Sequence, residues 1–307
     1  MILKNAFHRW FALFLAGALI GALAACGGGQ ASPTITAGPD QPTATAESSP
    51  TPETPTATPA PLAARVNGEG ILLTDFEAEL ARYQAANPND SAGLEAQQQV
   101  VLDEMITQAL LAQAAVQNGF SMDDAALQAR MDALAQQSGG YPALQDWMQR
   151  NGYTEEDFRR ALRLSAAAAW QRDRVAAEVP ETAEQVHARQ IFVLDEATAS
   201  QLLSMIQGGS DFSLLAAQYD SVTAGELGWF PRGYLTQKEV EDAAFALEAG
   251  KTSAVIHSAI GYHIIQVVER DPQRNLSADA RKVLQEQKLR DWVQQQRQSG
   301  AIEILIP

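Results

Sequence analysis

The feature that most limits what this chain can fold into is a proline- and threonine-rich stretch from Gly27 to Pro61. It holds eight of the fourteen prolines and no lysine or arginine. Such a composition cannot bury enough apolar surface to offset the conformational entropy lost on ordering. Proline also keeps the chain extended, at up to ~3.1 Å per residue. We therefore expect a disordered tether over residues 26–61 and a folded part after it.

Composition and charge narrow the classes of protein that the folded part can belong to. The chain has 307 residues, 46% of them hydrophobic, which is enough for one large or two medium domains. Its net charge of −15 argues against a nucleic-acid partner, because phosphate binding needs clustered lysine and arginine. A single cysteine excludes an internal disulfide, and the four histidines lack the ligand spacing of a zinc motif. No cofactor or metal is expected.

Residues 1–25 have the pattern of a secretory signal. Lys4 and Arg9 precede an apolar run, Trp10 to Ala25, that is a few residues short of a comfortable membrane span of ~20. The run ends in Leu-Ala-Ala-Cys, which resembles the bacterial lipobox. The resemblance implies cleavage before Cys26, lipid attachment to it, and anchoring on the extracytoplasmic face of a bacterial membrane, in the cell envelope. The alternative is an ordinary signal peptide followed by a chance cysteine.

Residues 62–179 show the periodicity of a helical domain. A short strand and an Asn67-Gly68 turn open it. Apolar residues then recur at helical spacing in several segments. Capping pairs three residues apart precede three of these segments: Thr74 with Glu77, Ser121 with Asp124, and Thr154 with Asp157. The apolar stripes most simply form a core; the alternative is that some line a groove for polypeptide chains.

The pattern of apolar residues changes at Pro180, and two further regions follow. Residues 180–272 read as strand, helix, helix, a glycine-punctuated loop over 225–233, helix, strand and strand, which predicts an α+β domain with helices on a small sheet. Residues 273–307 hold a long polar helix and an alternating tail. We expect this tail to pair with the strand at Val66, so that the C-terminal helix and strand pack back on the helical domain.

Four ordered blocks in the second region resemble one family. GELGWFPRG (225–233), EDAAFAL (241–247), GK (250–251) and GYHIIQV (261–267) are similar to the parvulin-type peptidyl-prolyl isomerase domain. The segment VNGEGILLTDFEAEL (66–80) and the helices after it resemble the N-terminal chaperone region of SurA- and PrsA-like foldases. The lipobox fits the PrsA-like lipoproteins. The implied fold is an all-α SurA-like N-terminal domain followed by a parvulin-like α+β domain with a small antiparallel sheet.

The resemblance also implies a site. Its catalytic positions fall on His263 and Gln190, and its substrate-binding positions fall on Leu227, Phe230, Leu235 and Val240. The family has a histidine where this chain has Gln190, and a cysteine or aspartate near the position of Val222. His187 lies three residues before Gln190, and an odd offset in a strand points it to the other face. The alternative for His263 is a structural histidine packed within its strand.

Two functions remain open. The first is an active peptidyl-prolyl cis–trans isomerase, or foldase, that acts on unfolded or partly folded exported polypeptides with X-Pro bonds. The second is a lipid-anchored holdase chaperone whose parvulin domain has lost or weakened its activity, since Gln190 and Val222 replace usual site residues. A solute-binding lipoprotein is disfavoured because the alternating βαβ pattern is missing.

Overall fold

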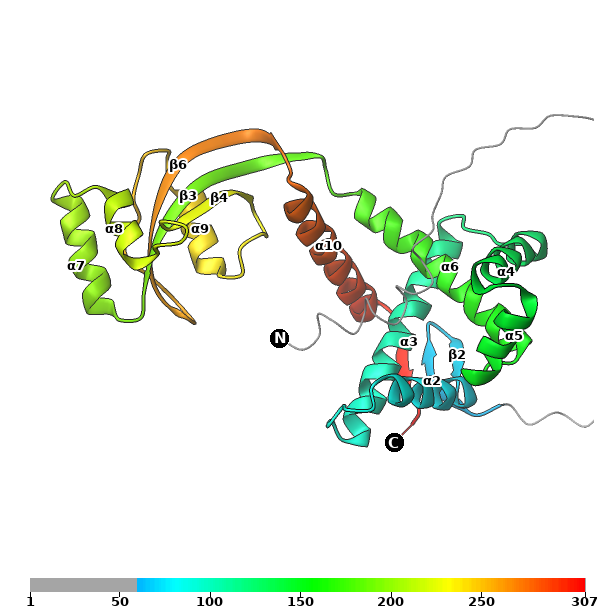
Figure 1. Cartoon of the computed structure of the whole chain (residues 1–307). Coiled ribbons are helices and arrows are strands. Elements are labelled where there is room, and N and C mark those ends of the chain that lie inside the picture. The colour runs from blue at the N-terminus through cyan, green and yellow to red at the C-terminus, as the bar shows by residue number, and fades with distance from the viewer. Residues whose placement is uncertain (1–59, 307) are drawn as a thin grey trace, which may run out of the picture.

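The computed structural model describes residues 60–306, so the predicted signal sequence, Cys26 and all of the predicted tether except residues 60 and 61 lie outside the described residues. Two lobes are joined by a long two-stranded ribbon and by helix α10 (Ala278–Ser299), which returns the chain to the first lobe (Figure 1). The first lobe is mostly helical, and the second holds a small antiparallel sheet with helices. This arrangement confirms the predicted fold class.

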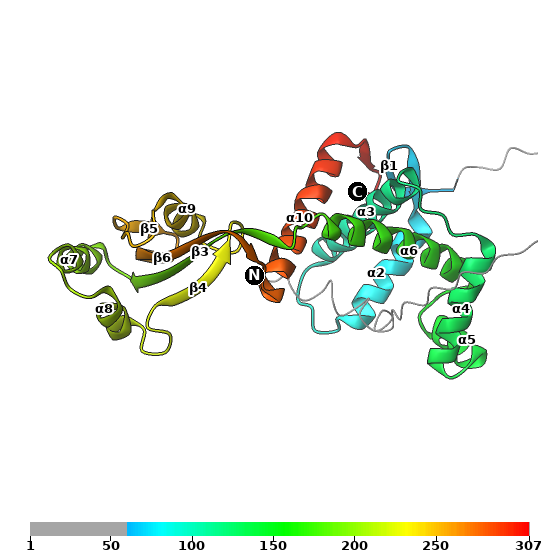
Figure 2. The same cartoon turned by 90° about the horizontal axis from the view of Figure 1, so that it is seen from above.

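Alanines bring the two long helices of the first lobe close together. Within this lobe the helices are α2 (Leu73–Ala86), α3 (Leu94–Gln117), α4 (Asp124–Ser138), α5 (Tyr141–Arg150) and α6 (Glu155–Ala177). Ala112 and Ala115 on α3 form a buried cluster with Ala167 on α6. Because alanine ends at Cβ, the two helix backbones can approach closely. α3 and α6 therefore lie side by side, as Figure 2 also shows.

Two of the three predicted helix caps are wrong. The Thr154 hydroxyl accepts from the Asp157 backbone N–H at 3.1 Å, as predicted. Helix α2, however, already begins at Leu73, whose N–H bonds the Pro61 carbonyl, so the chain passes directly from strand into helix and Thr74 caps nothing. The N-cap of α4 is Asp123 rather than Ser121. Its carboxylate accepts a hydrogen bond from the Ala126 backbone N–H in the first turn, as an N-cap side chain does.

A three-stranded sheet joins both ends of the described chain to the first lobe. Its strand order is β2-β1-β7, with β1 (Leu62–Val66), β2 (Glu69–Leu72) and β7 (Ile302–Ile304), and both pairs are antiparallel. Val66 pairs with Ile302, which confirms the predicted pairing of the tail. In the turn after β1, the Asn67 side chain accepts from the Ala301 N–H at 3.0 Å. Arg297 on α10 adds a bond to Asp103 on α3 at 3.0 Å.

The second lobe is a four-stranded antiparallel sheet with helices on both faces. Its strand order is β4-β3-β6-β5. The strands are β3 (Thr182–Val193), β4 (Glu226–Pro231), β5 (Ile256–Ser258) and β6 (Gly261–Asn275), and the helices are α7 (Glu196–Gln207), α8 (Phe212–Tyr219) and α9 (Lys238–Ala246). One face carries an apolar cluster with α7 and α8, and the other face carries a cluster with α9.

The predicted loop over residues 225–233 is a strand for most of its length. Glu226–Pro231 forms β4 and pairs with β3, Phe230 lying opposite Val186. Phe230 is fully buried, so the removal of its side chain from water stabilises the pairing of β4 with β3. The glycines at 225 and 228 take positive φ angles, and glycines at this spacing are typical of a loop.

The described helices are not built to cross a membrane. Over residues 60–306, none combines sufficient length with sufficient apolar character for a span. The domain limits 62–179, 180–272 and 273–307 stay predictions.

Candidate active site

His263 lies at the centre of the sheet of the second lobe. It is on β6, opposite Phe192 on β3 and Ile256 on β5, so a strand flanks it on each side. The side chain is only 2% exposed. The Phe192 ring lies 5.0 Å from the imidazole, measured between ring centroids. This position explains the burial of a polar ring: the sheet fixes it from the backbone and an aromatic side chain covers it.

Both imidazole nitrogens of His263 have hydrogen-bond partners. Nδ1 lies 3.1 Å from Gln190 Oε1, and Nε2 lies 2.8 Å from Ser258 Oγ. An amide oxygen only accepts, so Nδ1 carries the proton and Nε2 accepts from the Ser258 hydroxyl. Ser258 Oγ in turn accepts from the Ile260 N–H at 3.3 Å. The three side chains therefore form one directed chain from Ser258 to Gln190.

Burial keeps His263 in its neutral form. Removal of the ring from water lowers the pKa of His263 below its ordinary value, and the nearby charge of Glu239 opposes this only in part. A neutral imidazole is the form that the directed chain requires.

His187 lies apart from the hydrogen bonds around His263. His187 lies against Trp229, with ring centroids 5.4 Å apart, and pairs with Glu226. It does not take part in the bonds around His263. Gln190 thus occupies the place beside His263, and His187 does not substitute for it, as the strand alternation predicted.

Ser258 was missed by sequence reasoning. It ends β5 and begins the tight turn to β6, where its hydroxyl also lies 3.3 Å from the Gly261 carbonyl oxygen. A serine at a turn has an ordinary structural explanation, so no local signal marked it. At 3% exposed it is not placed to attack a substrate, and the Ser258–His263 pair is not a nucleophile–base pair.

The four predicted pocket residues come together beside α9. Phe230 and Val240 belong to one buried cluster, and Leu227 and Leu235 pack against it. Phe230 is 0% exposed and Val240 is 3% exposed, whereas Leu227 and Leu235 are half-buried. Leu227 and Leu235 therefore offer the apolar surface that a ligand can touch, and the other two support it from below. Their role in substrate binding stays a prediction.

Glu241 holds the loop that carries Leu235. Its buried carboxylate accepts three backbone N–H groups, from Gly233 at 2.8 Å, Tyr234 at 3.0 Å and Leu235 at 3.1 Å. Bonds to an ionised acceptor are stronger than neutral ones. One side chain thus fixes the loop, a contact that the sequence did not reveal because the charge lies in a helix six to eight residues away.

The loop before β4 closes on Gln190 through its backbone. The Gly225 carbonyl accepts from the Gln190 N–H at 2.8 Å. The Asp220 side chain accepts from the N–H groups of Val222 and Thr223 within this loop. Val222 is 90% exposed. Val222, which the resemblance predicts to stand in place of a polar site residue, therefore exposes an apolar side chain to solvent.

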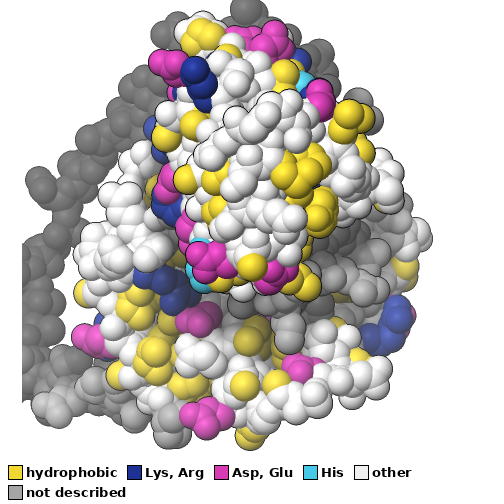
Figure 3. All heavy atoms as spheres, turned by 90° about the vertical axis from the view of Figure 1, so that its left-hand side faces the viewer, with side chains coloured by type: hydrophobic (Ala, Val, Ile, Leu, Met, Phe, Trp, Pro, Cys, Tyr) yellow, Lys and Arg dark blue, Asp and Glu magenta, His cyan; other side chains and the backbone are white. Residues whose placement is uncertain are grey.

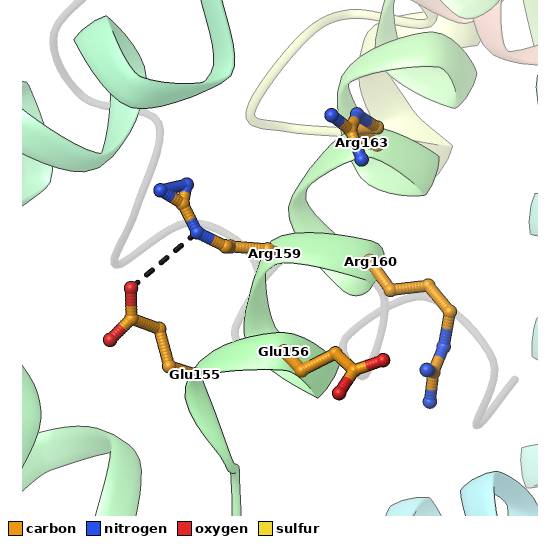
Figure 4. A pocket seen from close by; sticks show the side chains of 5 residues that line it. All are labelled: Glu155, Glu156, Arg159, Arg160 and Arg163. Atoms are coloured by element: carbon orange, nitrogen blue, oxygen red, sulfur yellow. Dashed lines mark ion pairs between the residues drawn. The ribbon is translucent and has the colours of Figure 1, made fainter. Parts of the chain in front are cut away.

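A cleft on the first lobe is lined by charged side chains that form ion pairs. It has a volume of about 540 Å³ and is lined by Glu155, Glu156, Arg159, Arg160 and Arg163 (Figure 4). Arg159 pairs with Glu155 at 3.5 Å and Arg160 with Asp75 at 2.9 Å. Arg163 pairs with Asp124 on α4. These arginines join α6 to α2 and α4, so the cleft is best explained as structural.

Comparison with known families accounts for both lobes. Residues 179–271 match the family described as the PPIC-type PPIase domain, and residues 2–169 match the SurA-like N-terminal domain. The second match covers more than half of the chain. The chain therefore belongs to the SurA-like family and carries a PPIase domain of the parvulin type.

Individual relatives are foldases named PrsA. Foldase protein PrsA of Geobacillus sp. (strain WCH70) is 37% identical over 94 residues, which are 29% of this chain and 34% of the relative. Foldase protein PrsA 3 of Bacillus anthracis is 35% identical over 123 residues, which are 38% of this chain and 43% of the relative. A crystal structure of PrsA from Bacillus cereus is 24% identical, covers 76% of this chain and 88% of that chain, and gives a TM-score of 0.45. The chain thus matches less than half the length of these curated relatives.

The contact between Gly225 and Gln190 gives a prediction for stability. A Cβ at Gly225 would collide with the Gln190 carbonyl oxygen, whereas a Cβ at Gly228 meets nothing within 4 Å. Both residues have positive φ, 75° and 69°. We expect Gly228→Ala to lower the free energy of unfolding by about 1–2 kcal/mol, the cost of the left-handed conformation alone. Gly225→Ala should cost about 3 kcal/mol or more, because overpacking adds to that strain. Urea denaturation measures both, and equal losses would contradict the account.

Proposed function

We propose that this chain is a membrane-tethered, extracytoplasmic peptidyl-prolyl cis–trans isomerase that assists the folding of exported proteins. The observation that carries the proposal is the directed hydrogen-bond chain through Ser258, His263 and Gln190, on the sheet face that also bears the apolar cluster of Leu227 and Leu235. The PPIC-type match over residues 179–271 supports the same reading.

Cis–trans isomerisation of an X-Pro bond requires little covalent chemistry from the protein. Rotation about a peptide bond has a barrier of ~18–20 kcal/mol from amide resonance, and X-Pro isomerisation is slow enough to limit folding. A catalyst needs to bind the twisted amide more tightly than either planar form. It needs no nucleophile, which agrees with the burial of Ser258.

The residues of the site divide this task between them. Leu227 and Leu235 would hold the proline ring and exclude water, which destabilises the charge-separated planar amide relative to the twisted one. Gln190 uses its oxygen on His263, so its amide N–H groups are the donors that it can offer to a substrate carbonyl. His263 acts by positioning Gln190.

Substitution of His263 tests the proposal. We expect the wild-type chain to accelerate cis–trans exchange of a proline-containing peptide. We expect His263→Ala to lower kcat/KM roughly tenfold or more, because it removes the partner of the Gln190 side-chain oxygen. His257→Ala is the matched control: His257 is exposed on the neighbouring strand β5, and its loss should leave the rate unchanged. Exchange measured by NMR at high protein concentration gives the rates. An uncatalysed rate for the wild-type chain would refute the proposal.

A tethered holdase is the second candidate. Gln190 cannot change protonation near neutral pH, unlike the histidine that the family usually has there. Large apolar side chains are also exposed on the second lobe: Leu194, Leu214, Val222 and Ile260. Figure 3 shows hydrophobic side chains scattered over the end of this lobe. The holdase reading predicts suppression of client aggregation that His263→Ala does not change.

The membrane tether rests on the sequence before Ala60. The apolar run, the Leu-Ala-Ala-Cys motif and the proline-rich stretch support a lipid on Cys26 and a spacer that holds the lobes away from the membrane. We expect Cys26→Ala to move the protein from the membrane fraction to the soluble fraction of expressing cells, with loss of labelling by a fatty-acid analogue. Unchanged fractionation and labelling would contradict the lipid anchor.

A further inference from the structure

A cleft between the second lobe and helix α10 is not explained by the site described above. It has a volume of about 420 Å³. One wall is the loop after β4, and the other wall is helix α10. The lining residues are Gly233, Tyr234, Leu235, Thr236, Lys238, Glu241, Val283, Glu286, Gln287 and Arg290. Its volume is within the range of ~300–1,000 Å³ typical of ligand pockets.

The loop wall is fixed from two sides. The Glu241 carboxylate holds it from α9 through three backbone N–H groups. On the other side it approaches α10 so closely that a Cβ on Gly233 would lie 2.6 Å from the Gln287 side-chain oxygen and 3.1 Å from Leu284. The cleft is therefore formed before a ligand arrives, which lowers the ordering cost of binding.

The cleft is continuous with the proposed proline site. Leu235 lines the cleft, and it also packs against the cluster that contains Phe230 and Val240. A polypeptide whose proline ring contacts Leu235 would therefore have neighbouring residues at the mouth of the cleft.

The α10 wall has the chemistry of a peptide-binding surface. Val283 is apolar, and the Gln287 amide can both donate and accept hydrogen bonds. Among the described residues, Glu286 and Arg290 have no ion-pair partner, whereas Lys238 at the opposite wall is paired with Asp242. The α10 wall thus offers one apolar side chain, one amide and two opposite charges. This mixture suits the polar backbone and varied side chains of an extended polypeptide better than it suits an apolar ligand or an anion.

We propose that helix α10 forms a second binding subsite, which takes the stretch of client polypeptide adjacent to the isomerised proline. The inference rests on the proposed function for its occupant, and it makes the peptide site of this chain longer than the parvulin-type lobe itself.

The test compares two fluorescently labelled peptides that share one X-Pro core. One is a tetrapeptide, and the other is extended on both sides to about twelve residues, ~40 Å when fully extended. Fluorescence anisotropy with the full chain gives the Kd of each. Arg290→Trp obstructs the cleft from its exposed rim. Gln294→Trp is the matched control, because Gln294 is exposed one turn further along the same helix and does not line the cleft.

We expect the wild-type chain to bind the longer peptide about tenfold more tightly than the tetrapeptide, the gain typical of one well-placed contact region. Arg290→Trp should abolish this gain and leave tetrapeptide binding unchanged, and Gln294→Trp should retain it. Equal affinities of the wild-type chain for both peptides would overturn the proposal. An equal loss in both variants, or a loss for the tetrapeptide with Arg290→Trp, would also overturn it.

Two further outcomes identify other occupants and would overturn the proposal. Tighter binding of the longer peptide after removal of residues 1–59 would assign the cleft to the chain's own N-terminal segment. A Kd that rises with protein concentration would assign it to a second copy. Length-dependent binding without catalysis would refute the isomerase and leave the subsite standing, so the two failures are distinguishable.

Discussion

The pairing of β3 with β6 is the interaction on which the rest of the structure depends. The two strands are hydrogen-bonded from Thr182 and Asn275 at one end to Val193 and Tyr262 at the other. The part of this strand pair that ends at Val193 and Tyr262 forms the centre of the small sheet and places His263 beside Gln190. The part that ends at Thr182 and Asn275 leaves the sheet as the ribbon that joins the lobes (Figure 1). A shift of register by one residue would turn the imidazole to the opposite face of the sheet.

The same pairing explains why the helical lobe and the sheet lobe belong to one structure. Because β3 enters the second lobe and β6 leaves it side by side, α6 and α10 meet at the base of the ribbon, where Lys288 pairs with Glu178 at 3.1 Å. The chain then returns through α10 to β7, which completes the sheet beside β1. Helix α10 consequently contacts both the first lobe and the loop that carries Leu235.

The sequence predicted the parts of this fold that have a local signal or a family motif. The alternating tail predicted its pairing with β1, and the parvulin-like blocks predicted that Gln190 and His263 would meet. Strand β4 was missed because its glycines favour a loop locally, whereas its pairing with β3 depends on residues some forty positions away. Ser258 and Glu241 were missed because each acts through a contact across a turn or a loop, and neither leaves a periodic pattern.

His263 is a neutral, buried ring held in one tautomer between Gln190 and Ser258. Folding lowers its pKa, so protonation opposes the folded state, and the stability that the neutral ring contributes is lost as pH falls below ~6.5 and through the lowered value. Long-range ¹H–¹⁵N NMR of the imidazole tests this most directly. We predict a protonated Nδ1 and an unprotonated Nε2 that persist below pH ~6.5. A ring that titrates like an unperturbed histidine, or that carries its proton on Nε2, would contradict the account.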